Sequence, residues 1–399
     1  MNAGRARVVT ALGVAQTLAW ASSYYLAAIL ATPMAGAVGV AVPTVFAAFS
    51  VALIMSAAIG PLAGRAIDLR GGRPVLIATN VVFAAGLVML GLARGPVGLF
   101  AGWIVLGIGM GSGLYEAAFA TLVRLYGHAA RGPITGVTLF AGFASTVGWP
   151  LSTWLDVHYG WRDACFAWAG LHLLVALPLN LSLPRADPAP PRSATEPAPE
   201  DEPVDTSRAA AMLAWVFAVT WFISTAMAAH LPQLMMAGGA TLATAVLVGA
   251  LVGPAQVAAR ILEFSVLRRV HPLLSARLAT LMHPLGAVLL MTAGTPLAVV
   301  FGLLHGAGNG ILTIAKGTLP LVLFGTAGYG HRQGLLMVPA RVAQALAPWL
   351  FGLCLARWGI GSLWVSTILG VTAFAALLLL RPSGARPVAP VVPDVAAME

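Results

Sequence analysis

The chain has 399 residues, of which 59% are hydrophobic and only 9% are charged, and its mean hydropathy is +0.89. Apolar runs of roughly 20 residues recur along the whole length, which excludes a water-soluble globular domain and predicts membrane-spanning helices. The net charge of +9 does not indicate nucleic-acid binding, because the arginines are dispersed between apolar runs and form no basic stripe.

The apolar runs predict twelve transmembrane helices, so we expect an all-α membrane protein. Each run can cross about 30 Å of hydrocarbon, where only closed backbone hydrogen bonding is stable. A β-barrel is disfavoured, because the runs are solidly apolar rather than alternating. The predicted spans are residues 8–31, 44–63, 75–93, 97–123, 134–155, 163–183, 209–236, 241–262, 276–293, 297–322, 335–356 and 361–381.

Two segments have compositions that do not favour folding. Residues 184–208 carry seven prolines and six acidic residues in 25 positions, which predicts a disordered cytoplasmic linker. Residues 382–399 form a proline-rich tail that we expect on the same side of the membrane. The linker separates an N-terminal six-helix bundle, residues 1–183, from a C-terminal six-helix bundle, residues 209–381.

The two halves repeat each other in sequence. Three glycines in the fourth span recur in the tenth at an offset of 197, and a proline in the fifth recurs in the eleventh at 198. Such duplication is typical of transporters that hold a site between two bundles. The glycines lie inside apolar runs with no exposed helix N-terminus expected, so we interpret them as close-packing positions and not as a nucleotide loop. The paired residues are Gly109, Gly111 and Gly113 with Gly306, Gly308 and Gly310, and Pro150 with Pro348.

The distribution of positive charge predicts the orientation in the membrane. With the N-terminus in the cytoplasm, 17 of the 22 Lys and Arg residues lie on the inner side, and the N- and C-termini are both cytoplasmic. Three lie outside (Arg94, Arg162 and Arg357), and two lie within spans (Lys316 and Arg341). We therefore expect a multi-pass protein of a bacterial-type cytoplasmic, or inner, membrane.

Charge is concentrated in "GRAIDLRGGR", residues 64–73, between the second and third spans. We expect Gly64 to let the second helix run close to a neighbour, Asp68 to lie at the cytoplasmic mouth and Gly71 to turn the chain. This segment resembles the loop G-x-x-x-D-x-x-G-x-[RK] of the major facilitator superfamily (MFS), with Gly64, Asp68, Gly71 and Arg73 at the four motif positions. The twelve spans and the central linker extend the resemblance over nearly the whole chain.

The resemblance implies two pseudo-symmetric six-helix bundles and a secondary transporter rather than an enzyme. It also implies that Asp68 contacts the cytoplasmic end of the eleventh helix and stabilises the outward-facing state. The alternative is a charged loop that only sets topology. In the second half, residues 259–269 keep the charges but not the glycines, so we expect a weaker second latch at Arg260 and Glu263.

Three ionisable residues fall inside spans, where a charge is costly unless it is paired or faces water: Glu116, Lys316 and Arg341. In one hypothesis, Glu116 bridges Lys316 or Arg341 and closes an inner gate. In another, Lys316, the only lysine, and Arg341 form a cationic floor for an anion, while Glu116 carries a proton or balances charge. A third interpretation is structural: the groups reach the interface or bind free backbone carbonyls.

Further polar residues are candidates for the wall of a cavity. His305 and Asn309 share the tenth span with Lys316 at helical spacing, and His305 could titrate near neutral pH. Family resemblance implies that spans one and seven also line the cavity, which nominates Gln16, Trp20, Tyr24 and Tyr25 with Trp221 and Gln233.

These features favour a secondary transporter for a small organic anion such as a monocarboxylate. The two embedded cations look similar to those of bacterial monocarboxylate and oxalate-type carriers. We expect protons as the coupling ion, a small-molecule substrate, the lipid bilayer as surroundings and a monomer. We expect no cofactor, no metal site and no nucleic-acid partner, and the two cysteines lack CxxC spacing. The alternatives are efflux of a drug or of a toxic metalloid or oxyanion, and a transporter-like membrane sensor.

Overall fold

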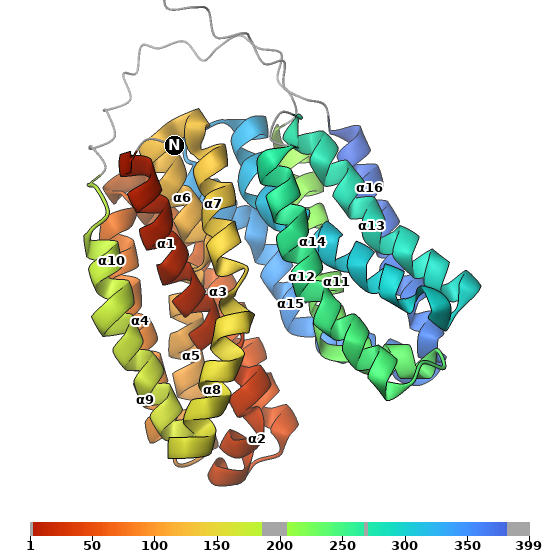
Figure 1. The fold of residues 1–399 in the computed structure, drawn as a ribbon. Helices are drawn as coiled ribbons and strands as arrows, with labels where there is room; N and C mark the ends of the chain where they lie inside the picture. Colours follow the sequence, from red (N-terminus) through yellow and green to blue (C-terminus); the bar gives the residue numbers. More distant parts are fainter. Residues whose placement is uncertain (1–2, 186–205, 267–269, 381–399) are drawn as a thin grey trace, which may run out of the picture.

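The structure, a computed structural model, describes residues 3–185, 206–266 and 270–380. Within these ranges every regular element is a helix. Figure 1 shows the helices in two groups, with the first half of the chain in one and the second half in the other. The predicted tail, 382–399, and the predicted linker, 184–208, apart from its two ends, lie outside the described residues.

The first group contains ten helical segments. Pro43 and Pro96 stand in the first turns of their helices, where the missing N–H costs nothing, and Gly71 and Gly160 separate successive helices with φ of 81° and 90°. The segments are α1 (Ala3–Ser22), α2 (Leu26–Val38), α3 (Val42–Arg70), α4 (Gly72–Leu92), α5 (Pro96–Gly113), α6 (Tyr115–Tyr126), α7 (Arg131–Ala141), α8 (Ala144–Tyr159), α9 (Trp161–Leu171) and α10 (Leu177–Leu181).

The second group contains six α-helices, and two of them continue through the prolines inside them, Pro320 in one and Pro339 and Pro348 in the other. They are α11 (Thr206–Ala237), α12 (Leu242–Ser265), α13 (Pro272–Ala293), α14 (Ala298–Phe324), α15 (Tyr329–Trp358) and α16 (Leu363–Leu379).

The described residues hold ten helical stretches that are long and apolar enough to cross a membrane. Two of them, Pro96–Tyr159 and Tyr329–Leu379, have 64 and 51 residues, enough for two passes each at about 20 residues a pass. Each is divided by a short 3-10 turn that begins at a glycine of positive φ, Gly127 or Gly359. The described chain therefore makes twelve passes, as the sequence predicted.

Some of the predicted spans are interrupted. Residues 8–31 are divided between α1 and α2, and residues 97–123 break at Leu114, whose ψ of −163° separates α5 from α6. The expectation of an uninterrupted fourth span was therefore wrong, because a helix begins at Tyr115, directly after the glycine-rich run. Glycine lowers helix stability by about 1 kcal/mol relative to alanine, and three glycines precede the break at alternate positions. The matching α14 is continuous.

The glycines of α5 and α14 pack these helices against their neighbours. A Cβ at Gly107 would lie 2.5 Å from the carbonyl oxygen of Ala52 in α3, and one at Gly306 would lie 2.6 Å from that of Val252 in α12. The close-packing interpretation is confirmed. The repeat register is corrected, however, because the glycines with equivalent contacts are 199 residues apart and not 197. They are Gly107 and Gly306, Gly109 and Gly308, and Gly111 and Gly310.

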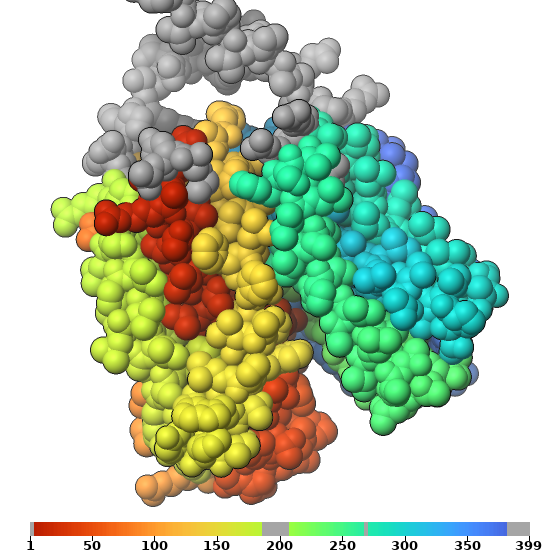
Figure 2. Space-filling model, in the orientation of Figure 1, coloured from red at the N-terminus to blue at the C-terminus, as the bar shows by residue number. Residues whose placement is uncertain are grey.

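The two bundles touch on the side of the linker and separate at the other end. Figure 2 shows a notch between α8 and α12, at the end of the molecule where α8 ends and α12 begins. The opposite end, where α10 ends and α11 begins, is called the linker side below. On the linker side, α7 packs on α12 and α14, while α15 packs on α3 from Gly330 beside Asp68 to Ala345 beside Ser50. The structure therefore shows a cleft between the bundles that opens away from the linker.

Candidate functional site

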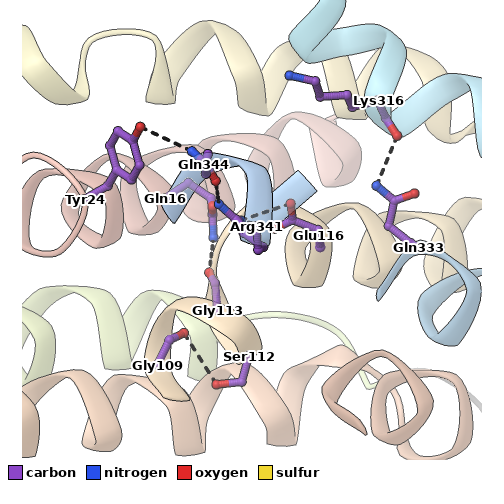
Figure 3. Close-up of polar contacts among 10 residues, drawn as sticks. All are labelled: Gln16, Tyr24, Gly109, Ser112, Gly113, Glu116, Lys316, Gln333, Arg341 and Gln344. Atoms are coloured by element: carbon purple, nitrogen blue, oxygen red, sulfur yellow. Dashed lines mark hydrogen bonds and ion pairs between the residues drawn. The ribbon is translucent and has the colours of Figure 1, made fainter. Parts of the chain in front are cut away.

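A buried ion pair joins the two bundles beneath this notch. Arg341 of α15 donates from Nη2 to both carboxylate oxygens of Glu116 in α6, at 3.1 and 3.0 Å. The side chains are only 3% and 14% exposed, so little water shields the pair. Figure 3 shows Arg341 between Glu116 and Gln344. Of the two partners that the sequence offered Glu116, the structure thus selects Arg341.

Glu116 is placed favourably by the break at Leu114. It lies in the first turn of α6, where the helix dipole stabilises a carboxylate. On the other side of the break, Gln16 donates from Nε2 to the Gly113 carbonyl at 2.6 Å, which satisfies a backbone group at the end of α5. Gln16 therefore supports the break, and its Oε1 is buried without a hydrogen-bond partner among the described residues.

Lys316 is buried close to the ion pair but is not part of it. Its side chain lies in α14, the residue is 4% exposed, and Nζ has no hydrogen-bond partner in the described part of the chain. Nζ lies 4.0 Å from the ring centroid of Trp221 in α11, a cation–π contact. The same ring faces Arg341, whose Cζ is 5.6 Å from the centroid. Lys316 thus has a desolvated amino group with an aromatic neighbour and a free hydrogen-bonding capacity.

Aromatic side chains from both bundles surround these charges. Trp20 of α1 stacks on Trp221 with ring centroids 6.2 Å apart and an angle of 11° between planes. Tyr24 and Tyr115 both lie against Trp20, at centroid distances of 5.3 and 4.9 Å. This set of four rings, Trp20, Tyr24, Tyr115 and Trp221, is called the aromatic wall below.

A hydrogen-bonded chain extends from the ion pair to the aromatic wall. Arg341 donates from Nη1 to Gln344 Oε1 at 2.9 Å, and Gln344 donates from Nε2 to the Tyr24 hydroxyl at 3.2 Å. The Thr225 hydroxyl of α11 lies 3.4 Å from the Tyr24 hydroxyl and extends the chain. The sequence analysis missed Gln344 and Thr225. Gln344 could have been found, since it lies three residues from Arg341 and so on the same helix face.

The structure does not bring His305 and Asn309 into this site, which corrects the expectation that they join Lys316. They line a separate cavity inside the second bundle, between α11, α13, α14 and α16. His305 contacts His283, which the sequence analysis did not consider, with Nδ1 atoms 3.0 Å apart. Helical spacing along α14 places His305, Asn309 and Lys316 on one stripe, as the sequence analysis expected. The surroundings of this stripe change along the helix, however: His305 and Asn309 line the cavity inside the second bundle, whereas Lys316 lies close to the ion pair.

The charged segment 64–73, which the sequence analysis placed in a loop, begins within the last turns of α3 and contacts the beginning of α15. Asp68 accepts hydrogen bonds from the backbone N–H groups of Gly330 and His331, both at 2.8 Å. Gly64 is in direct contact with Gly330, and a Cβ there would overlap the Gly330 carbonyl. The expected contacts of Asp68 and Gly64 are thus present. Gly71, with φ of 81°, begins the turn into α4, and the half-buried Arg73 forms no ion pair within the described ranges.

A second contact on the same side joins α12 to α7. Arg131 of α7 donates from Nη2 to Glu263 Oε1 at 2.9 Å. Arg260 is buried and donates from Nη1 to the Thr138 carbonyl at 2.9 Å. Burial and the nearby Arg131 and Arg277 guanidinium groups lower the pKa of His271, at the start of α13, which favours its neutral form. The ends of α3 and α12, which carry the repeated charge pattern, therefore both bridge the bundles on the linker side.

Two six-helix bundles, a buried charged site between them and a cleft that opens at one end define a membrane transport protein. The model of the Major Facilitator Superfamily matches residues 12–294, and the chain belongs to this family. It is therefore a secondary transporter and not an enzyme.

Relatives and solved structures agree with this assignment. A protein of Thermoproteus tenax, described as an uncharacterized 38 kDa protein in the 23S RNA operon, is 30% identical over 332 residues, or 83% of this chain and 84% of that protein. The multidrug resistance protein fnx1 of Schizosaccharomyces pombe is 31% identical over 113 residues, which cover 28% of this chain and 21% of that protein. The human organic anion transporter MFSD10 has the same fold, with a TM-score of 0.70 at 16% identity, over 94% of this chain and 99% of that one.

Proposed function

We propose that this transporter moves a small organic anion with one carboxylate, such as a monocarboxylate, by alternating access and in a proton-coupled manner. The observation that carries the proposal is Lys316, whose buried amino group has no hydrogen-bond partner among the described residues. A buried charge without a counter-ion is costly, and a substrate carboxylate would supply both the charge and the acceptor. Lys316 is therefore our choice for the carboxylate-binding residue.

The charge balance of the site supports a monoanion. Glu116 forms an ion pair with Arg341, whereas no acidic side chain among the described residues pairs with Lys316. A dicarboxylate such as oxalate would need Arg341 to leave Glu116. The aromatic wall adds an apolar surface, which favours an anion with a hydrocarbon body.

The contacts near the linker support a role as gates. Asp68, Glu116 and Glu263 each join one bundle to the other while the notch is open at the opposite end. Breaking these contacts would let the linker side open, and reforming them would close it. We place the linker side in the cytoplasm, because most of the arginines lie there, and we propose a bacterial-type inner membrane and a monomer.

Uptake into proteoliposomes with an imposed pH gradient tests the proposal. The panel contains monocarboxylates of increasing apolar size, dicarboxylates, cationic drugs and arsenite. We expect uptake of a monocarboxylate, and we expect Lys316→Gln to weaken its binding roughly 10- to 100-fold, since a hydrogen bond to a charged group contributes about 1.5–3 kcal/mol. Arg65→Gln removes an exposed positive charge and is the matched control. Wild-type affinity in Lys316→Gln would contradict the assignment.

Drug efflux is the second candidate, and the aromatic wall favours it. Four rings around two cations fit an aromatic drug that carries a negative charge, and the partial match to a multidrug resistance protein agrees with this substrate class. The same panel separates the candidates: drug transport that is insensitive to Lys316→Gln but lost in Trp221→Leu supports efflux.

A further inference from the structure

The second bundle contains a buried histidine pair that the proposed carboxylate site does not use. His283 of α13 and His305 of α14 are 7% and 5% exposed, and their Nδ1 atoms are 3.0 Å apart. They line a cavity of about 20 Å³, enough for a single water molecule. The other polar residues of its lining are Thr220, Ser224, Thr280 and Asn309.

We assign the hydrogens of the pair from the hydrogen bonds around it. Ser366 Oγ lies 3.0 Å from both the Leu363 carbonyl and His283 Nε2, and we assign its hydroxyl hydrogen to the carbonyl, so that its oxygen accepts from His283 Nε2. His283 therefore carries its hydrogen on Nε2 and accepts at Nδ1. The donor to that nitrogen is His305 Nδ1, which leaves a lone pair on His305 Nε2. This atom has no hydrogen-bond partner in the described part of the chain.

We propose that His305 Nε2 is the site at which this transporter binds its coupling proton, with His283 as its hydrogen-bonded partner. A hydronium ion in the cavity would transfer its extra proton to Nε2 and become neutral water. The resulting imidazolium keeps its Nδ1–H bond to His283, which in turn keeps its bond to Ser366. The inference rests on the proposed transport function, and it separates the proton site from the carboxylate site.

The charges around the cavity indicate what protonation would do. Apart from His283 and His305, none of the charged or titratable side chains on the surrounding helices lines the cavity, and α16 has none. An imidazolium would therefore lack a counter-charge in the resting cavity, and it would favour a state in which the cavity takes up water or an anion lies nearby. The side chains concerned are Arg208 and His230 of α11, Arg260 and Glu263 of α12, Arg277 of α13, and Lys316 of α14.

The position of the pair suits coupling to an anion at Lys316. His305 and Lys316 are 11 residues apart on the continuous α14, which is three turns, or about 16 Å at 1.5 Å per residue. A carboxylate on Lys316 would cancel the one unpaired positive charge on this helix and so make protonation of His305 less costly. Substrate and proton would thus bind together, which is what proton-driven accumulation requires.

The first test needs no substrate. Spin labels at Val157 of α8 and Leu242 of α12, both exposed and on opposite sides of the notch, report its width in chains whose Cys165 and Cys354 are replaced by alanine. We expect the distance distribution to shift between pH 8 and pH 4.5, and the shift to disappear in His305→Asn, which keeps a donor for His283. The control His230→Gln keeps its bond to the Pro348 carbonyl and should keep the shift. A shift that persists in His305→Asn, or no shift in the parent, overturns the proposal.

The second test uses transport. In proteoliposomes, His305→Asn should lose accumulation driven by a pH gradient while it retains exchange of labelled for unlabelled carboxylate, which needs no net proton movement. Retained accumulation overturns the proton site and leaves the carboxylate site intact. Unchanged carboxylate binding in Lys316→Gln overturns the proposed function instead, and the spin-label result then still decides the proton site.

Discussion

Replacement of Glu116 by glutamine tests the ion pair between the bundles most directly. The change preserves size and removes the charge, so Arg341, whose side chain is 3% exposed, keeps only neutral acceptors. Removing one partner of a buried ion pair costs about 3–5 kcal/mol, and the 14% exposure of Glu116 argues for the lower end. About 3 kcal/mol changes the ratio of two conformations roughly 140-fold. The state whose notch opens away from the linker should lose that much stability.

Distances between spin labels at Val157 and Leu242, in the chain that lacks Cys165 and Cys354, report this loss of stability. We expect the notch to narrow in Glu116→Gln. The exchanged pair, Glu116→Arg with Arg341→Glu, should restore part of the original distribution, because it rebuilds the bridge with its direction reversed. A parent-like distribution in Glu116→Gln would refute the reasoning that this pair stabilises the observed state.

Three further predictions concern the contacts near the linker. Gly64→Ala should separate α3 from α15 and cost about 1–3 kcal/mol of stability. Gly253→Ala, whose added Cβ meets nothing within 4 Å, should be nearly neutral. Thermal unfolding in detergent compares the two variants, and equal losses would contradict the packing argument. Asp68→Asn should weaken two hydrogen bonds to the start of α15 and, like Glu116→Gln, narrow the notch, as the spin labels would report. Arg131→Gln and Glu263→Gln should each destabilise the state with the open notch, and the double variant should destabilise it no more than the more severe single variant does. Fully additive effects on the populations that the spin labels report would argue that the two residues act independently.

Much of the fold follows from local features of the sequence. Apolar runs long enough to cross a bilayer predict the passes, because no other backbone conformation with such a composition is stable in lipid. The contact between Gly64 and α15 could be anticipated from the motif. Its first position is a glycine, and a residue without a side chain allows two helix backbones to meet. The pairing of Glu116 with a cation of the second bundle could be anticipated from their equal depth.

Other features depend on contacts that no single stretch of sequence contains. The break at Leu114 is stabilised by Gln16, which is 97 residues earlier in the chain. The repeat register was displaced by two residues because alternate glycines can be aligned at several offsets, and only their partners in α3 and α12 distinguish them. The pairing of His283 with His305 likewise requires knowing which faces of α13 and α14 meet.

The interrupted fourth pass gives the two halves different mechanical properties. In the second half, α14 carries Lys316 on one continuous rod of 27 residues, so this ammonium moves only with its whole bundle. In the first half, the joint at Leu114 leaves Glu116 on α6, a short helix of 12 residues. We expect a rotation of α6 about that joint to withdraw the carboxylate from Arg341 before the bundles move.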